Sequence, residues 1–135
     1  MTKQELCRKA QDMLKMAYAP YSHFPVGAAL ECADGTVFTG CNIENAAYGP
    51  SNCAERTAVF KAVSEGYRQF KRIAIAASTE TFCAPCGVCR QVLSEFDPGL
   101  QMEVILVNRD GKTKELTLAE LFPYSFGSDT LESAL

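Results

Sequence analysis

A short apolar run at residues 72–78 lies between two expected helices. In the first, 53–65, apolar residues recur at helical spacing; the second, 86–96, begins after Pro85 and ends before the stop Asp-Pro-Gly at 97–99. The run has the length of one strand and is largely apolar, which is typical of a central strand covered on both faces. Ser51 or Asn52 is the expected cap of the first helix. A strand with a helix before it and after it predicts an α/β protein built in layers.

The remaining elements are expected to complete a single sheet. Thr2 and Glu5 have the spacing of a capping box and predict an N-terminal helix. Two pairs of β-compatible runs, each joined by a turn containing Asp-Gly, predict two hairpins. The expected fold is a three-layer α/β/α sandwich, with a mixed five-stranded sheet whose last strand pair is antiparallel, in one domain of residues 1–135. The expected strands are 26–31, 36–41, 72–78, 102–107 and 113–116, followed by a short helix capped by Thr117 and Glu120.

Composition narrows the class of partner. The net charge is -3 and the pI is about 5.2, whereas proteins that bind a phosphate backbone need clustered Lys and Arg. We therefore expect a small-molecule ligand and no nucleic acid. The first residues lack the apolar core of a signal peptide, and no apolar run approaches the roughly 20 residues of a membrane span. The expected location is the cytoplasm, with no membrane partner.

Cysteine usage points to a metal. Seven cysteines is an odd number in a chain without an export signal, which favours reduced thiols over a disulfide framework. Cys86 and Cys89 are one helical turn apart, and Cys53 stands at the other helix start. If the two helices follow consecutive strand ends, their N-termini lie side by side and the three thiolates converge. Such a set predicts one zinc ion per chain with an open fourth position.

Two neighbours of Cys53 suit catalysis at that position. Glu55 is too close in sequence to be a comfortable fourth ligand, but its carboxylate can reach a water at the open position and carry protons. Three thiolates leave Zn²⁺ with a formal charge of -1. We expect two helix N-termini and a hydrogen bond from Arg56 to a ligand sulfur to offset that charge.

Plainer interpretations of these residues stay open. Cys-x-x-Cys also occurs in redox motifs and structural zinc sites, and Cys83 could complete a four-sulfur zinc site or an iron-sulfur cluster. His23, the only histidine, has no nucleophile motif nearby and is expected to be a solvated or lining side chain. The remaining cysteines are expected to be small buried hydrophobes; they are Cys7, Cys32 and Cys41.

The motifs resemble a known superfamily. Cys-Ala-Glu at 53–55 followed by Pro-Cys-x-x-Cys at 85–89 is similar to the signature of the zinc-dependent nucleobase deaminases. Nearly the whole chain resembles the small homotetrameric cytidine deaminases. The stretches that carry this resemblance are residues 19–30, 40–48 and 53–56.

The resemblance implies hydrolytic deamination of cytidine and deoxycytidine to uridine and deoxyuridine, a pyrimidine salvage reaction. It implies that Cys53, Cys86 and Cys89 hold zinc and that Glu55 passes a proton from water to N3 and then to the departing amine. It further implies a homotetramer whose neighbouring subunits complete each site. The implied substrate-binding residues are Asn42 and Glu44 at the ribose, Phe24 at the base, the backbone of Ala54 and Cys86 at the polar edge, and Tyr48 and Phe126 reaching across. Phe122 stands where the family more often has Leu, which bears on local packing.

The late hairpin discriminates within the superfamily. Its turn, around Arg109, Asp110 and Gly111, leaves no room for a helix between the last two strands, so those strands run antiparallel. The resemblance associates this arrangement with free nucleosides, whereas enzymes that edit nucleic acids tend to have a helix there. Two rivals remain: a related deaminase of another aminated heterocycle, such as an antibiotic of the blasticidin type, and a structural or redox metal-binding module. Sequence alone does not rank cytidine against deoxycytidine.

Overall fold

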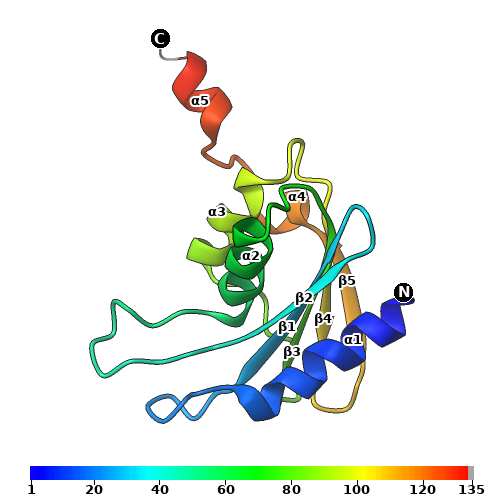
Figure 1. Ribbon diagram of the computed structural model, residues 1–135, viewed down its shortest axis with the longest axis vertical. Coiled ribbons are helices and arrows are strands. Elements are labelled where there is room, and N and C mark those ends of the chain that lie inside the picture. The colour runs from blue at the N-terminus through cyan, green and yellow to red at the C-terminus, as the bar shows by residue number, and fades with distance from the viewer. Residues whose placement is uncertain (134–135) are drawn as a thin grey trace.

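The computed structural model describes residues 1–133 and has the predicted three-layer architecture. Five strands form one mixed sheet in the order β2-β1-β3-β4-β5, with α1 on one face and α2 and α3 on the other (Figure 1). The strands are β1 (Val26–Cys32), β2 (Val37–Cys41), β3 (Phe70–Ala77), β4 (Glu103–Val107) and β5 (Thr113–Thr117). The helices are α1 (Lys3–Asp12), α2 (Ala54–Ser64), α3 (Gly87–Glu95), α4 (Leu118–Leu121) and α5 (Ser128–Ser133), with a 3-10 turn η1 (Met13–Met16).

Strand directions confirm the predicted mixed sheet. β1 is antiparallel to β2 and β3, β3 is parallel to β4, and β4 is antiparallel to β5. The apolar run at 72–78 forms most of the central strand β3. Its alternate side chains enter two separate clusters, Ile73 and Ile75 beneath α2 and Ala74 and Ala76 beneath α1. Burial on both faces is the reason that this strand is apolar throughout.

Local end signals set the starts of α1 and α4. The capping boxes of Thr2 with Glu5 and of Thr117 with Glu120 are both present. The expected cap of α2 was wrong, because Cys53 itself is the N-cap and makes no side-chain cap bond. Asn52 instead donates from Nδ2 to Thr57 Oγ1 at 3.1 Å. Cys53 thus occupies the cap position, but its sulfur does not cap the helix.

Gly40 lets α2 begin directly against β2. A Cβ atom at this position would lie 2.3 Å from the carbonyl oxygen of Ala54 and 2.6 Å from the amide nitrogen of Ala58. Real Cβ atoms do not approach backbone atoms so closely, so any side chain here would push the helix away. The absence of a side chain at Gly40 fixes the height of the first turn of α2 above the sheet.

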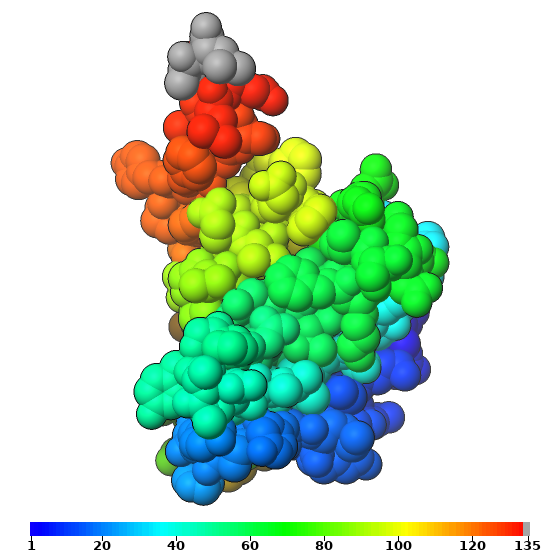
Figure 2. All heavy atoms as spheres, turned by 60° about the vertical axis from the view of Figure 1, so that its left-hand side comes forward, coloured from blue at the N-terminus to red at the C-terminus, as the bar shows by residue number. Residues whose placement is uncertain are grey.

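The C-terminal helix α5 was not predicted. It stands clear of the body at the end of the red segment (Figures 1 and 2) and buries none of its residues. Residues 122–127, which connect it to α4, form neither helix nor strand. The position of residues 122–127 therefore depends on side-chain contacts with the rest of the protein.

Candidate metal and nucleoside site

Three cysteine sulfurs converge at the starts of α2 and α3. Cys53 is the N-cap of α2, Cys86 is the N-cap of α3, and Cys89 is buried in the first turn of α3. Their Sγ atoms all lie within 4.8 Å of one another, and those of Cys53 and Cys86 are 3.8 Å apart. The predicted convergence is present.

The sheet topology explains the meeting of these two helices. β2 and β3 are not neighbours, because β1 lies between them, but both end opposite the beginning of β1. Gly27 pairs with Cys41 at the end of β2, and Val26 pairs with Ala77 at the end of β3. The chain leaves both strands at the same end of the sheet, so the helices that follow start close together.

The three thiols fit a zinc ion. Tetrahedral Zn²⁺ with bonds of about 2.3 Å separates its sulfur ligands by about 3.8 Å, which matches the spacing of Cys53 and Cys86. A contact with Cys89, aided by Arg56, lowers the pKa of the Cys53 thiol to about 5, whereas the same contact raises the pKa of Cys89. One thiolate therefore disfavours the next, and a divalent cation is what allows all three to ionise together.

Arg56 supports this cluster from α2. Its Nη2 donates to Cys53 Sγ at 3.3 Å. Its Nε is buried and has no hydrogen-bond partner among residues 1–133. A guanidinium that donates to a thiolate stabilises the negative charge of the sulfur. This contact is the hydrogen bond from Arg56 to a ligand sulfur that the sequence predicted.

Glu55 is a buried carboxyl beside the sulfurs. It lies in the first turn of α2 and is only 4% exposed. Burial is the main cause that raises its pKa to about 7, and the negative charge of Cys53 adds to the effect. A carboxyl with a pKa near neutrality can both accept and release a proton, as a proton carrier must.

Asn42 and Glu44 lie on the loop after β2 and hold the segment that contains Phe24. Asn42 accepts a hydrogen bond from the Val26 amide at 2.9 Å and donates to the Phe24 carbonyl at 2.8 Å. Glu44 accepts from the amides of Tyr21 and Ser22, each at 3.0 Å, and from the Ser22 hydroxyl. The bond from Ser22 lowers the pKa of Glu44, so this carboxylate stays ionised.

One cavity joins these loop residues to one of the metal ligands, Cys53. Ile43 pairs with Asn52 through two backbone hydrogen bonds of 2.9 Å, which brings both ends of the loop together. The adjoining cavity has a volume of about 390 Å³. Its lining residues include Asn42, Glu44, Tyr48, Cys53 and Arg56. The structure therefore brings together three of the predicted substrate residues with one metal ligand and the supporting arginine.

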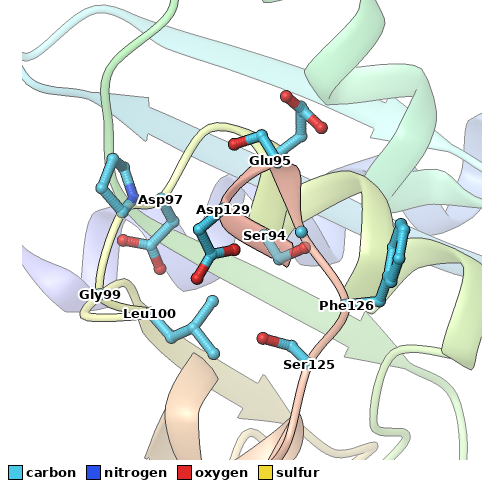
Figure 3. A pocket seen from close by; sticks show the side chains of 11 residues that line it. Ser94, Glu95, Asp97, Gly99, Leu100, Ser125, Phe126 and Asp129 are labelled. Atoms are coloured by element: carbon cyan, nitrogen blue, oxygen red, sulfur yellow. The ribbon is translucent and has the colours of Figure 1, made fainter. Parts of the chain in front are cut away.

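The other predicted substrate residues lie outside that lining. Ala54 is fully buried in the first turn of α2, and Phe24 is 39% exposed on its loop. Phe126 is 53% exposed and lines a separate cavity of about 440 Å³ between the end of α3 and residues 125–129 (Figure 3). Within one chain, then, Phe126 does not join the cysteine cavity.

The remaining candidates stay apart from the cluster. Cys83 is half-buried and does not belong to the metal-binding group found among residues 1–133, which consists of Cys53, Cys86 and Cys89. His23 is exposed with a φ of 57°, on the loop before β1. The other three cysteines are buried, as predicted. In the part of the chain that the structure describes, no helix has the length and apolar composition of a membrane span.

Several supporting residues escaped the sequence analysis. Ser22 orients Glu44, and Thr57 donates to the Cys41 carbonyl at 3.0 Å, which ties α2 to the end of β2. Arg90 and Gln91 of α3 donate to the carbonyls of Leu121 and Phe126, respectively. Glu44 is 22 residues from Ser22 and Leu121 is 31 residues from Arg90, so no local pattern could have revealed these two contacts. Arg90 directly follows a ligand, and that adjacency was the only available signal.

Comparison with known proteins agrees with this geometry. The family model for the cytidine and deoxycytidylate deaminase zinc-binding region matches residues 1–105. A cytidine deaminase from Sporosarcina psychrophila is 51% identical over 134 residues, covering 99% of this chain and 98% of that protein. One from Halalkalibacterium halodurans is 48% identical over 131 residues, covering 97% and 98%.

A solved structure shows the same fold. The crystal structure of cytidine deaminase from Burkholderia pseudomallei superposes with a TM-score of 0.89 at 48% identity, covering 93% of this chain and all of that chain. The matched family region includes Cys53, Glu55, Cys86 and Cys89, the residues that the structure gathers at the starts of α2 and α3. The chain belongs to the cytidine and deoxycytidylate deaminase family.

Proposed function

We propose that the protein hydrolyses cytidine and deoxycytidine to uridine and deoxyuridine, with release of ammonia. The observation that carries this proposal is the convergence of three thiols beside a buried carboxyl, Glu55, at the starts of two helices. The relatives named as cytidine deaminases over nearly the full chain support the same reaction. The chain carries no clustered positive charge for a nucleic-acid strand, which favours a free nucleoside.

Cys53, Cys86 and Cys89 would hold the zinc ion. When bound there, the ion would act as a Lewis acid toward a water molecule whose oxygen is to attack C4 of the pyrimidine. The Glu55 carboxylate accepts a proton from that water and delivers it to N3 of the ring. It would then take the remaining proton of the new C4 hydroxyl and pass it to the amine at C4, which leaves as ammonia while that oxygen becomes the carbonyl of uridine. Burial of Glu55 keeps bulk water away from this transfer.

Positive groups around the sulfurs partly compensate their negative charge. Arg56 donates to Cys53, and the N-terminal ends of α2 and α3 both point at the cluster. Each helix end contributes roughly half a positive charge. Together these groups offset the excess negative charge of three thiolates and keep the ion a useful Lewis acid.

The nucleoside is proposed to occupy the cavity beside Tyr48. Asn42 and Glu44 line that cavity and offer an amide and an ionised carboxylate to the ribose hydroxyls. Phe24 supplies an aromatic face for the base. The backbone groups of Ala54 and Cys86 contact the polar edge of the pyrimidine.

We further propose that the chain is one domain that works as a homotetramer in the cytoplasm, in pyrimidine salvage. Tyr48 is 82% exposed and Phe126 is 53% exposed, so both aromatic rings are accessible to a neighbouring subunit. In the proposed tetramer these side chains complete the sites of neighbouring subunits. Measurement of mass in solution by light scattering tests this assembly, and a monomer with full activity would refute it.

Two measurements on the purified protein test the reaction. Zinc content should be about one ion per chain, and cytidine absorbance should fall on incubation. Glu55→Gln should keep the zinc and lower the turnover by about a hundredfold to ten-thousandfold, because only the proton carrier is removed. Stoichiometric zinc without turnover of any nucleoside would favour a structural metal module. Turnover of a blasticidin-type substrate in preference to cytidine would reassign the substrate.

A further inference from the structure

Arg90 links the metal-binding loop to the C-terminal segment. Its Nε donates to the Pro85 carbonyl at 2.7 Å, and its Nη1 donates to the Leu121 carbonyl at 2.5 Å. Pro85 directly precedes the ligand Cys86, whereas Leu121 is the last residue of α4. One guanidinium therefore bridges two backbone carbonyls that are 36 residues apart (121 minus 85).

We propose that Arg90 is a positioning residue that holds Cys86 in its metal-binding orientation and couples it to the C-terminal segment, residues 122–126. The proposal deepens the proposed zinc site and rests on it. It assigns no contact between Arg90 and the substrate. Arg90 acts through the peptide that joins Pro85 to Cys86.

The contact with Pro85 is well placed to orient that peptide. Pro85 is buried and lies before the helix, so its carbonyl does not take part in the regular bonding of α3. Fixing a carbonyl fixes the plane of its peptide, and this plane includes the backbone nitrogen of Cys86. Because the guanidinium is charged, its hydrogen bonds are about twice as strong as neutral ones.

The C-terminal segment is held from both ends by consecutive residues of α3. Arg90 bonds the carbonyl of Leu121 just before the segment, and Gln91 donates from Nε2 to the Phe126 carbonyl at its far end, at 2.9 Å. Phe126 is among the residues that line the cavity at the end of α3 (Figure 3). The segment is therefore tied to α3 by both residues, and within residues 1–133 it is Arg90 that also bonds the Pro85 carbonyl.

The difference between Arg90 and Gln91 gives a matched experiment. Zinc release to an excess of chelator is timed, without substrate, for Arg90→Ala, Gln91→Ala and the exposed control Glu95→Ala. Hydrogen-deuterium exchange of residues 122–127 is measured on the same zinc-loaded samples, after light scattering confirms an unchanged assembly. Arg90→Ala should speed both zinc release, by about tenfold, and exchange. Gln91→Ala should speed exchange alone, and Glu95→Ala neither.

A conservative variant separates positioning from general destabilisation. Arg90→Lys keeps the charge but offers a single ammonium in place of a planar fork, so it should restore part of the slow zinc release. If Arg90→Ala does not fold, Arg90→Lys carries the comparison, with release about threefold faster than in Glu95→Ala. Release from the Arg90 variant within twofold of the control, or equal acceleration in Gln91→Ala, would overturn the proposal. Because no turnover is measured, failure of the proposed reaction leaves this test intact.

Discussion

The metal half and the proposed nucleoside half of the candidate site are built in opposite ways. Cys53, Cys86 and Cys89 sit at the starts of two helices that pack on the sheet, with their Sγ atoms within 4.8 Å of one another, and Glu55 is buried in the first turn of α2. Tyr48 and Phe126 lie on segments without helix or strand and are exposed. The thiols and the Glu55 carboxyl are thus held by the core, whereas the two aromatic side chains project from it.

This contrast separates two physical requirements. Three thiolates must be within about 4 Å of one another, and only a rigid scaffold keeps like charges that close. An aromatic wall has a looser requirement, because stacking tolerates small shifts. The comparison predicts large, specific losses for changes in the metal half and small, graded losses for changes in the nucleoside half.

The largest effect is expected for a ligand. Cys89→Ala removes one of the three sulfurs, so zinc content should fall well below one ion per chain and turnover of cytidine should fall to background. Metal analysis and the absorbance assay check this outcome. Cys83→Ala is the matched control, because Cys83 lies outside the cluster and should keep full zinc. Loss of zinc from the control would restore the four-sulfur site.

Arg56→Ala should have the next largest effect. The fold should persist, because Arg56 is only partly buried, but zinc affinity or activity should fall by about tenfold to a hundredfold as the hydrogen bond to Cys53 is lost. Competition with a chelator measures the affinity. Unchanged affinity and unchanged activity together would remove the role given to this guanidinium.

Gly40→Ala tests how the scaffold holds the metal half. The added methyl group meets the backbone of α2, so the free energy of unfolding should decrease by about 1–3 kcal/mol or more. Denaturant unfolding measures this loss. Gly49→Ala is the matched control, since a methyl group there meets nothing within 4 Å. Equal stability of the two variants would show that the first turn of α2 can move.

The smallest effect is expected in the nucleoside half. Tyr48→Ala removes one aromatic wall, so KM for cytidine should rise about two- to tenfold while zinc content stays constant. Tyr124→Ala removes a fully exposed tyrosine outside the cavity and should leave KM unchanged. Steady-state kinetics decide between them. A loss for Tyr48→Ala as large as that for Cys89→Ala would contradict the division into two halves.

Sequence reasoning succeeded where the signal is local. The capping boxes, both hairpins and the strand at 72–78 depend on residues within a few positions of one another, and all are present. The cap of α2 was wrong, because Ser51 and Asn52 have the usual composition but tertiary contacts place Cys53 there. The C-terminal helix, which buries nothing, had no apolar periodicity to reveal it.

What the sequence by itself determined is the chemistry: the sulfur donors, the acid beside them, and the helix starts that carry both, since residue type and short spacing are sufficient for these. Only the tertiary structure decided that β1 lies between β2 and β3, whose ends are at the same end of the sheet. It also decided that Arg90 bridges Pro85 and Leu121. Such contacts join positions far apart in the chain. Their geometry follows from how the whole sheet and its helices pack, which no local pattern contains.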